Sequence, residues 1–234
     1  MSGDTGVRLG LGIMKASPIR CLVTAGPTRE YIDPVRFISN PSTGKMGYAL
    51  AEAAVDRGWE VDLISGPVAL SRPERVKFHL IETAEQMRTT LSQLFQRCDL
   101  LLMVAAVSDF RPKRQLAHKE KKRVACRSLD LEPTPDLLLE LGQQKGDRMV
   151  VGFAAETENL VENGLRKLNE KNLDWIAINR VGLPDVGFGS DTNEITLIGA
   201  QGDRYSLGPG LKSDLAKEFL DVLKIEPHLT CCSS

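Results

Sequence analysis

The amino-acid sequence predicts an α/β fold: a Rossmann-like, doubly wound and mostly parallel sheet with a small β-hairpin appendage. Three observations predict it. Short apolar runs alternate along the chain with stretches of helical periodicity, which is the order of a parallel sheet covered by helices on both faces. The run at residues 99–107 is apolar at almost every position, as a strand covered on both faces requires. A short polar turn near the C-terminus separates two β-like segments.

Each element follows from a local pattern. Strands are predicted where an apolar run ends at a turn or a helix: 20–26, 59–66, 99–107, 149–157 and 173–180. Helices are predicted where apolar residues recur at intervals of three and four: 46–57, 84–98, 136–144, 159–171 and 213–223. The hairpin pairs 193–199 with 202–207 around a turn at 201–203. Strand order stays open, because the charged segment 108–134 and the glycine-rich segment 182–210 lack a clear period.

The chain is long enough to bury one sizeable core without disulfides. We expect a single domain over residues 1–234, with its core at about 18–225. Both tails are expected to be flexible, and the part after Pro227 to lack structure.

Charge and cysteine content exclude several classes of protein. The 30 basic and 31 acidic residues nearly cancel, which argues against general binding of nucleic acids or anionic membranes. No stretch of about 18 apolar residues predicts a transmembrane helix. The odd number of cysteines shows no metal-binding spacing, so a reducing cytoplasm is expected, with Cys21 and Cys98 as core residues.

A glycine-rich segment follows the first predicted strand and leads into the first helix. Gly26 ends the strand, and NPSTGKMG, with Gly44 and Gly47, precedes the helix. Glycines let the backbone approach an oxyanion, and helix N-terminal amides attract it. Ser42 adds a hydroxyl donor and, with Thr43, a possible N-cap. The spacing matches neither GxxxxGK[ST] nor GxGxxG, so a plain helix start is the alternative.

Small and polar residues follow the third predicted strand. Ala105 and Ala106 leave room for a ligand to press against the backbone. Asp109 lies where the carboxyl end of the strand faces the ligand crevice of such folds. It could accept hydrogen bonds from a sugar or base, lie near a metal, or simply begin a turn.

Two groups of lysines are candidates for binding a polyphosphate. Lys119 belongs to a basic loop, KEKK, that could neutralise charge in a transition state. Lys167 and Lys171 lie four apart and hence on one helix face. Solvated surface charge is the alternative for both groups. The three histidines are scattered and no catalytic triad is visible, which favours positioning and electrostatics over nucleophilic catalysis.

At these residues the sequence resembles the bacterial phosphopantothenate–cysteine ligase (phosphopantothenoylcysteine synthetase, CoaB-type) family. The similar motifs keep one order along the chain: TAGPTRE, IDPVRFISNPSTGKMG, SGPV, AAVSDFRP, KEKK, PTPDLL, VGFAAET, the Lys167/Lys171 pair and AINRVGLPDVGFGSDTNEITLI. Several motifs in one order are far more specific than any one of them.

The resemblance implies a two-step ligase of coenzyme A biosynthesis. The carboxylate of 4'-phosphopantothenate attacks CTP to give an acyl-cytidylate and pyrophosphate, and L-cysteine then forms the amide and releases CMP. Mg²⁺ is expected with the triphosphate, its protein ligands unknown. An ATP-using version of this ligase, a dinucleotide-binding Rossmann oxidoreductase and a non-catalytic nucleotide-binding module are the alternatives.

The resemblance also implies roles for individual residues. The expected catalytic residues are Asn40, which would hold the acyl group and polarise its carbonyl, and Lys119. The expected phosphopantothenate contacts are Arg36, Asn40, Ala105 and Ala106, with Arg36 reaching across a homodimer. The expected nucleotide contacts are Gly26, Ser42, Gly44, Gly47, Asp109, Lys119, Thr134, Pro135, Asp136, Leu137, Phe153, Lys167, Lys171 and Asn179.

The sequence departs from the family pattern at two places. Thr134 stands where the family has an asparagine, and Glu120 interrupts the lysine motif where an aliphatic residue is usual. The flavin-dependent decarboxylase half of the bifunctional enzyme is missing, so a stand-alone ligase, with a separate decarboxylase as a partner, or an excised domain is expected.

Overall fold

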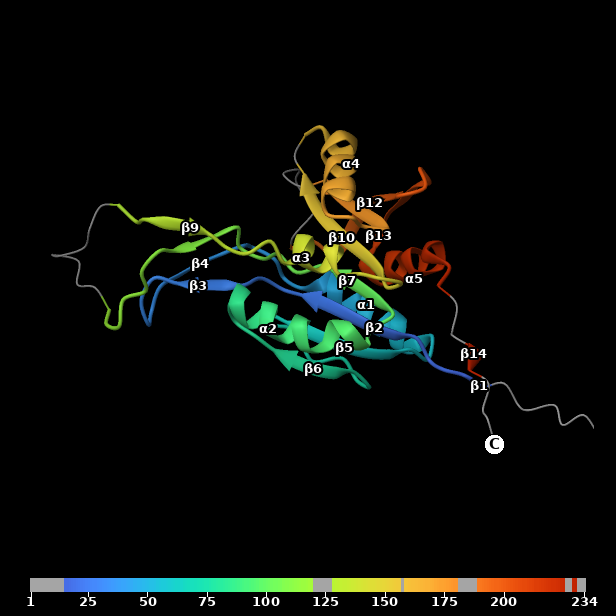
Figure 1. Ribbon diagram of the computed structural model, residues 1–234, viewed down its shortest axis with the longest axis horizontal. Helices are drawn as coiled ribbons and strands as arrows, with labels where there is room; N and C mark the ends of the chain where they lie inside the picture. The colour runs from blue at the N-terminus through green and yellow to red at the C-terminus, as the bar shows by residue number, and fades with distance from the viewer. Residues whose placement is uncertain (1–14, 120–127, 157, 181–188, 226–228, 231–234) are drawn as a thin grey trace, which may run out of the picture.

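The computed structural model describes residues 15–119, 128–156, 158–180, 189–225 and 229–230. Its centre is an eight-stranded sheet (Figure 1), with the order β13-β12-β11-β10-β7-β2-β5-β6. In chain order these strands are β2 (Arg20–Ala25), β5 (Glu60–Ser65), β6 (Lys77–Leu80), β7 (Leu100–Met103), β10 (Met149–Glu156), β11 (Trp175–Arg180), β12 (Thr192–Gly199) and β13 (Arg204–Leu211). The predicted fold class is confirmed.

Six of these strands are parallel. Counted along the chain from β2 to β11, they stand in the order 3-2-1-4-5-6. Beyond β11, β12 pairs antiparallel with β11, and β13 pairs antiparallel with β12. In this arrangement the connections reverse direction between the first and fourth strands, β2 and β7. The sequence left this order open, and it decides where a ligand can bind.

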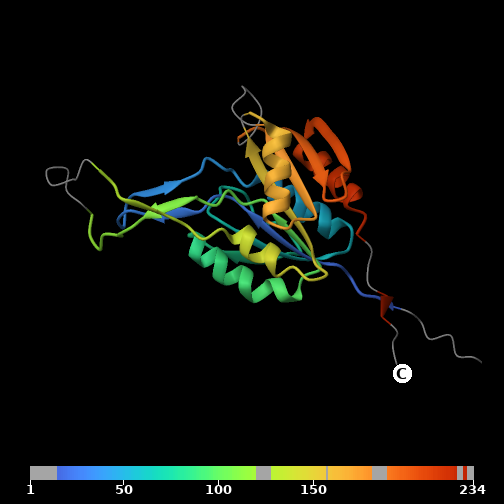
Figure 2. The same ribbon diagram turned by 45° about the horizontal axis from the view of Figure 1, so that its top comes forward.

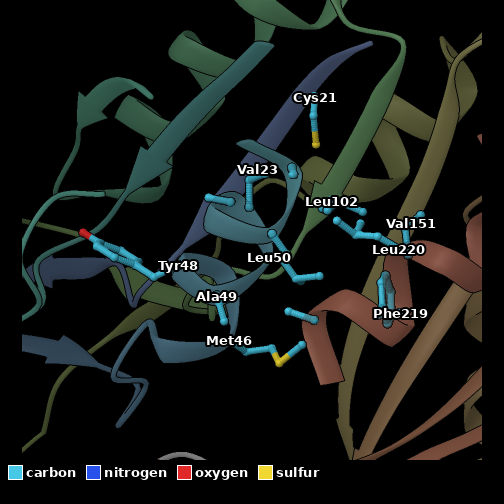
Figure 3. Packing of buried hydrophobic residues seen from close by; sticks show 14 of the residues in the cluster. Cys21, Val23, Met46, Tyr48, Ala49, Leu50, Leu102, Val151, Phe219 and Leu220 are labelled. Carbon is cyan, nitrogen blue, oxygen red and sulfur yellow. The ribbon is translucent and has the colours of Figure 1, made fainter. Parts of the chain in front are cut away.

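Helices cover both faces of the sheet. The helices are α1 (Lys45–Asp56), α2 (Ala84–Leu94), α3 (Leu137–Gln143), α4 (Leu160–Glu170) and α5 (Lys212–Leu223). Side chains of α1 and α5 pack with Val23, Leu102 and Val151 in one apolar cluster (Figure 3). Side chains of α2, α3 and α4 form a second cluster on the other face, which includes Leu22 and Leu101. Alternate residues of one strand therefore enter different clusters, as the pleat requires.

Local signals explain where the helices begin and end. Thr83 and Gln86 form a capping box at the start of α2, and Asp136 accepts a hydrogen bond from the Leu139 amide at the start of α3. The α-helix predicted over 84–98 ends at Leu94 and continues as a 3₁₀ turn, Phe95–Arg97. At α1 the N-cap is Gly44, which has no side chain to cap with, so the predicted cap by Ser42 or Thr43 is wrong.

Two antiparallel hairpins project from the sheet side by side, and we call them the arm (Figures 1 and 2). The hairpins pair β3 (Arg29–Tyr31) with β4 (Phe37–Ser39), and β8 (Phe110–Pro112) with β9 (Leu131–Pro133). The amide of Leu116 donates to the Ile32 carbonyl at 2.8 Å and joins the two hairpins. These strands were not predicted, because three residues are too few to show a period of two.

Other differences between the predicted and the observed elements have local causes. The strand predicted over 99–107 ends at Met103, because the Thr24 hydroxyl accepts hydrogen bonds from the amides of Val104 and Ala105. The short strand β6, with the sequence KFHL, was not predicted. The part of the C-terminal tail that is described forms β14 (Leu229–Thr230), which pairs with β1 (Lys15–Ala16), so the expected lack of structure is wrong there.

Cys21 and Cys98 are buried free thiols, as predicted, and burial raises the pKa of Cys98 to about 12. The other cysteines lie outside the described residues. Within the described part of the chain, every helix is too short or too polar to cross a membrane.

Candidate active site

A cavity of about 600 Å³ opens at the carboxyl edge of the sheet, where β2 and β7 lie side by side. Gly26 follows β2, and Ala105 and Ala106 follow β7. The amide of Ala106 donates to the Gly26 carbonyl at 2.9 Å and holds the two chain segments together as they leave the sheet. Doubly wound sheets bind ligands in the crevice at this reversal point.

The first wall of the cavity, the α1/α5 wall, consists of the glycine segment, the start of α1 and the start of α5. Gly26 and Gly44 have positive φ angles of 74° and 77°. A Cβ atom at Gly47 would lie 2.6 Å from the Cβ of Ala25, so only glycine lets α1 approach β2 this closely. The first amides of α1 are left uncapped at the cavity, as an anion site requires.

The second wall, the α3/α4 wall, consists of residues 134–138, Lys167 and Lys171. Lys167 Nζ lies 2.7 Å from Glu156, and Lys171 Nζ lies 2.8 Å from Asp136. Each lysine at the cavity is therefore paired with a carboxylate of the protein. The tertiary structure brings both to the cavity, which favours the ligand-binding interpretation over a purely solvated face.

Asn40 connects the glycine segment to the end of β7. Its Nδ2 donates to the carbonyls of Ala106 and Val107, at 3.1 and 3.2 Å. Both amide hydrogens are therefore engaged, and Oδ1 remains as an acceptor. Polarising an acyl carbonyl through Nδ2 would require one of these two hydrogen bonds to be exchanged.

Two further residues that line the cavity have side chains suited to contacting a ligand. Phe153 stacks on Phe219 of α5, with ring centroids 5.3 Å apart, and so presents a braced aromatic ring. Asn179 lines the cavity, and its Oδ1 is buried with no hydrogen-bond partner among the described residues. A buried acceptor without a partner is costly unless a ligand or water satisfies it.

The side chains of Thr134 and Asp109 have different environments. The Thr134 hydroxyl donates to the Ser108 carbonyl at 2.5 Å, and its amide donates to the Asp109 carbonyl. Asp109 itself has an exposed side chain at the cavity rim. The Thr134 side chain thus holds the turn, while the Asp109 side chain remains exposed at the cavity rim.

The structure brings together most of the site residues predicted from the sequence. Among the described residues, the predicted residues that line the cavity are Gly26, Asn40, Ser42, Gly44, Gly47, Ala105, Ala106, Asp109, Thr134, Pro135, Asp136, Leu137, Phe153, Lys167, Lys171 and Asn179.

Arg36 and Lys119 do not line the cavity. Arg36 lies at the turn of the first hairpin of the arm, where it pairs with the buried Asp33. Lys119 is exposed in the loop that follows β8, and the rest of its motif lies outside the described residues. Their roles remain predictions.

Among the lining residues that were not predicted, two are charged. Lys45 lies within the STGKMG motif, so its position in the sequence was a usable signal. Lys212 begins α5, far along the chain, and no pattern around it points to a ligand.

The described residues hold no group of three or more His, Cys, Asp or Glu side chains that could bind a metal ion. A dedicated protein cage for a metal is therefore absent from the described part. This still fits Mg²⁺, which is commonly held by substrate phosphates, waters and one or two carboxylates.

Comparison with known proteins identifies close relatives. The family model of the DNA/pantothenate metabolism flavoprotein C-terminal domain matches residues 17–225. Coenzyme A biosynthesis bifunctional protein CoaBC of Bacillus subtilis (strain 168) is 46% identical over 203 residues, which are 86% of this chain and 50% of the relative. CoaBC of Escherichia coli (strain K12) is 41% identical over 190 residues, which are 80% of this chain and 47% of the relative.

A solved structure of this kind of protein has a similar fold. The crystal structure of the C-terminal domain of coenzyme A biosynthesis bifunctional protein CoaBC has a TM-score of 0.75 and 41% identity. It covers 88% of this chain and 93% of that one. The chain thus spans about half the length of the curated relatives it matches.

Proposed function

We propose that this chain, which belongs to the family of the DNA/pantothenate metabolism flavoprotein C-terminal domain, is a phosphopantothenate–cysteine ligase of coenzyme A biosynthesis. The observation that carries the proposal is one cavity, shared by the uncapped, glycine-lined start of α1 and by the lysines of the α3/α4 wall. It offers backbone amides to phosphates at one end and paired lysines at the other.

The chemistry needs two displacements. An oxygen of the 4'-phosphopantothenate carboxylate bonds to the α-phosphorus of CTP, and pyrophosphate leaves. The amine of L-cysteine then bonds to the acyl carbon, and CMP leaves. The first step is needed because an unactivated carboxylate offers the amine only oxide as a leaving group.

The residues of the cavity fit these steps through binding and positioning. The start of α1 would hold the triphosphate, and the ring of Phe153 and the free acceptor of Asn179 would contact the nucleoside. Ala105 and Ala106 leave space for phosphopantothenate beside Asn40. Mg²⁺ bound with the triphosphate would neutralise phosphate charge, with Asp109 as its candidate carboxylate.

The direct test is turnover of the purified chain with 4'-phosphopantothenate, L-cysteine, Mg²⁺ and either CTP or ATP. We expect CMP and pyrophosphate in equal amounts, with CTP preferred. Product with ATP alone would correct the nucleotide but leave the ligase. Tight NAD(P) binding with no product from either nucleotide would favour the oxidoreductase, and CTP binding without acyl-cytidylate would favour a non-catalytic module.

We also propose that two copies of the chain form a homodimer through the arm. The arm exposes Val35, Phe37, Phe110 and Leu131, each more than 40% accessible. Pairing two copies would cover this apolar surface and bring Arg36 toward a partner's site.

Sedimentation of a Val35→Glu/Phe110→Glu variant tests the dimer. We expect a shift to monomer, while Leu80→Glu, at an exposed position on β6, should stay dimeric. A wild-type monomer would refute this part and leave the ligase proposal intact.

A further inference from the structure

The segment 104–108 follows β7, lines the cavity and is held by hydrogen bonds at almost every backbone amide. Four of its five amides donate to oxygen atoms of residues 24–28, at 2.9–3.1 Å: those of Val104, Ala105, Ala106 and Ser108. The fifth amide, that of Val107, has no hydrogen-bond partner among the described residues. A firmly held segment with one unused donor at a cavity wall is well arranged to bind an acceptor atom of a ligand.

The next residue, Ser108, supplies a second unused donor. It lines the cavity and is only 4% exposed, and its hydroxyl has no hydrogen-bond partner among the described residues. The backbone of Ser108 is fixed, because its amide donates to the Thr28 hydroxyl and its carbonyl accepts from the Thr134 hydroxyl. A buried hydroxyl without a partner is costly unless a ligand satisfies it. Two neutral donors that are adjacent in the chain are therefore available at this wall.

Asn40 contacts the peptide group that carries the Val107 amide. Its Nδ2 donates to the Ala106 carbonyl at 3.1 Å, and this carbonyl belongs to the same peptide group as the Val107 N–H. The Thr28 amide donates to the same carbonyl at 3.3 Å. Hydrogen bonds to a peptide carbonyl polarise the group, which makes its N–H a stronger donor. Asn40 can therefore act on a substrate through this peptide group while both of its own amide hydrogens stay engaged.

Neutral donors suit a carbonyl oxygen better than a phosphate. The charge of a phosphate can be met elsewhere in the cavity, by Lys167 and Lys171. An amide and a hydroxyl bind an uncharged carbonyl weakly, and the interaction strengthens as negative charge develops on its oxygen in the transition state. Ala105 and Ala106 directly precede the two donors, and their small side chains leave room for an acyl group there.

We infer that the Val107 amide and the Ser108 hydroxyl donate to the acyl carbonyl oxygen during amide formation, with Asn40 as their positioning residue. This assignment rests on the proposed ligase function and deepens it. As the amine nitrogen of cysteine bonds to the acyl carbon, a carbonyl electron pair moves onto the oxygen, where the two donors stabilise it. The pair then re-forms the carbonyl, the bond from carbon to the CMP oxygen breaks, and its electrons leave with CMP. The nitrogen gives up one proton to water.

The sharpest test removes the Val107 N–H alone, by incorporating the α-hydroxy acid analogue of valine at position 107, which turns the amide into an ester. In single-turnover assays of the full chain, pyrophosphate release without cysteine should stay within about threefold of wild type. Amide formation after cysteine is added should slow about 100-fold, as for one lost oxyanion donor. The matched control is the same ester at Val161, in the first turn of α4, where amides lack intrahelical partners. Val161 does not line the cavity, so both rates should stay unchanged there.

Ser108→Ala tests the second donor. We expect amide formation to slow about tenfold, as for one neutral hydrogen bond, while pyrophosphate release stays unchanged. The free energy of unfolding should not fall in urea denaturation, because the hydroxyl has no partner to lose. Ser92→Ala, on the exposed face of α2, is the control and should alter neither rate.

A double-mutant cycle tests the positioning role of Asn40. If Asn40 acts through the Val107 amide, Asn40→Ala slows amide formation in the native backbone but adds less than about threefold in the ester variant. Losses that multiply would give Asn40 its own contact with the acyl group and would overturn the positioning role. The KM for CTP should stay unchanged in all of these variants, whereas general damage to the cavity would raise it.

The wild-type protein separates this inference from the proposed function. If wild type releases no pyrophosphate and forms no amide with either nucleotide, the ligase proposal fails and the inference fails with it. If wild type forms the amide and the ester variant forms it at the same rate, only the inference is overturned. Should the ester variant not fold, Ser108→Ala decides: slowing confined to amide formation supports the inference, and unchanged rates or equal slowing of both steps overturn it.

Discussion

The two walls of the cavity are built in different ways. The α1/α5 wall presents backbone amides, made accessible by glycines at positions where a Cβ atom would collide. The α3/α4 wall presents long side chains, each held by a carboxylate. A backbone site depends on the exact packing of α1 against β2, whereas a side-chain site depends on individual charges. Substituting a glycine of the first wall should therefore abolish nucleotide binding, whereas substituting a lysine of the second wall should weaken it in steps.

The strongest test of this difference is Gly47→Ala. The new Cβ would lie 2.6 Å from Ala25 Cβ and 3.0 Å from the Thr24 carbonyl oxygen, so α1 must move. We expect the free energy of unfolding to fall by about 1–3 kcal/mol and CTP binding to be lost. Urea denaturation and calorimetry measure the two effects.

Gly58→Ala is the control at the other end of α1. Gly58 has open space around it and a φ of 76°. The free energy of unfolding of the variant should therefore fall by about 1 kcal/mol, from backbone strain alone. CTP binding should persist there. Unimpaired CTP binding in Gly47→Ala would contradict the packing account.

Lys167→Met and Lys171→Met should have intermediate effects. Each removes one ammonium from the α3/α4 wall, and we expect CTP affinity to fall about 10- to 100-fold per variant. Lys167→Met should also lower stability more than Lys171→Met, because it leaves the Glu156 side chain, 13% exposed, without its ion pair. A complete loss of binding in both would remove the distinction between the walls.

Asn40→Asp tests the position where the two substrates would meet. Its amide donates to two carbonyls, so a carboxylate there would face two acceptors and an acyl oxygen at once. We expect amide formation to slow more than pyrophosphate release, measured in single-turnover assays. Equal slowing of both steps would argue against a role in the second step.

The smallest effect is expected from Arg166→Met on the outer face of α4. Its ion pair with Glu170 spans one helical turn, with both side chains 57% exposed. Such pairs contribute about 0.3–0.5 kcal/mol, so denaturation midpoints should barely move and CTP affinity should stay the same. A tenfold change in CTP affinity would mean that general charge on α4, not the position of Lys167 and Lys171, attracts the nucleotide.

Much of the fold could be predicted because its signals are local. The run at β10 and the stripe of α2 each predicted their element, since burial on both faces or on one face sets the spacing of apolar residues. The arm could not be predicted, because its strands are three residues long and its two hairpins, which lie side by side, are some 80 residues apart in the chain.

The same distinction between local and long-range signals applies to the residues of the site. The glycines and Asn40 could be assigned from motifs that lie within one short segment. Lys45 was overlooked within that segment, and Lys212 had no sequence signal at all. The structure also shows the Thr134 hydroxyl bonded to the Ser108 carbonyl and both Asn40 amide hydrogens engaged, which no motif could indicate.

The amino-acid sequence by itself determined the alternation of strands and helices, the core residues and the glycine segment, because each depends on neighbouring side chains and on backbone freedom. Only the tertiary structure decided that β2 and β7 lie side by side, that the two walls face one cavity, and that Lys45, Asp191 and Lys212 meet there. The reason is physical: strand order and charge clusters depend on packing between distant segments, and such packing leaves no local period in the chain.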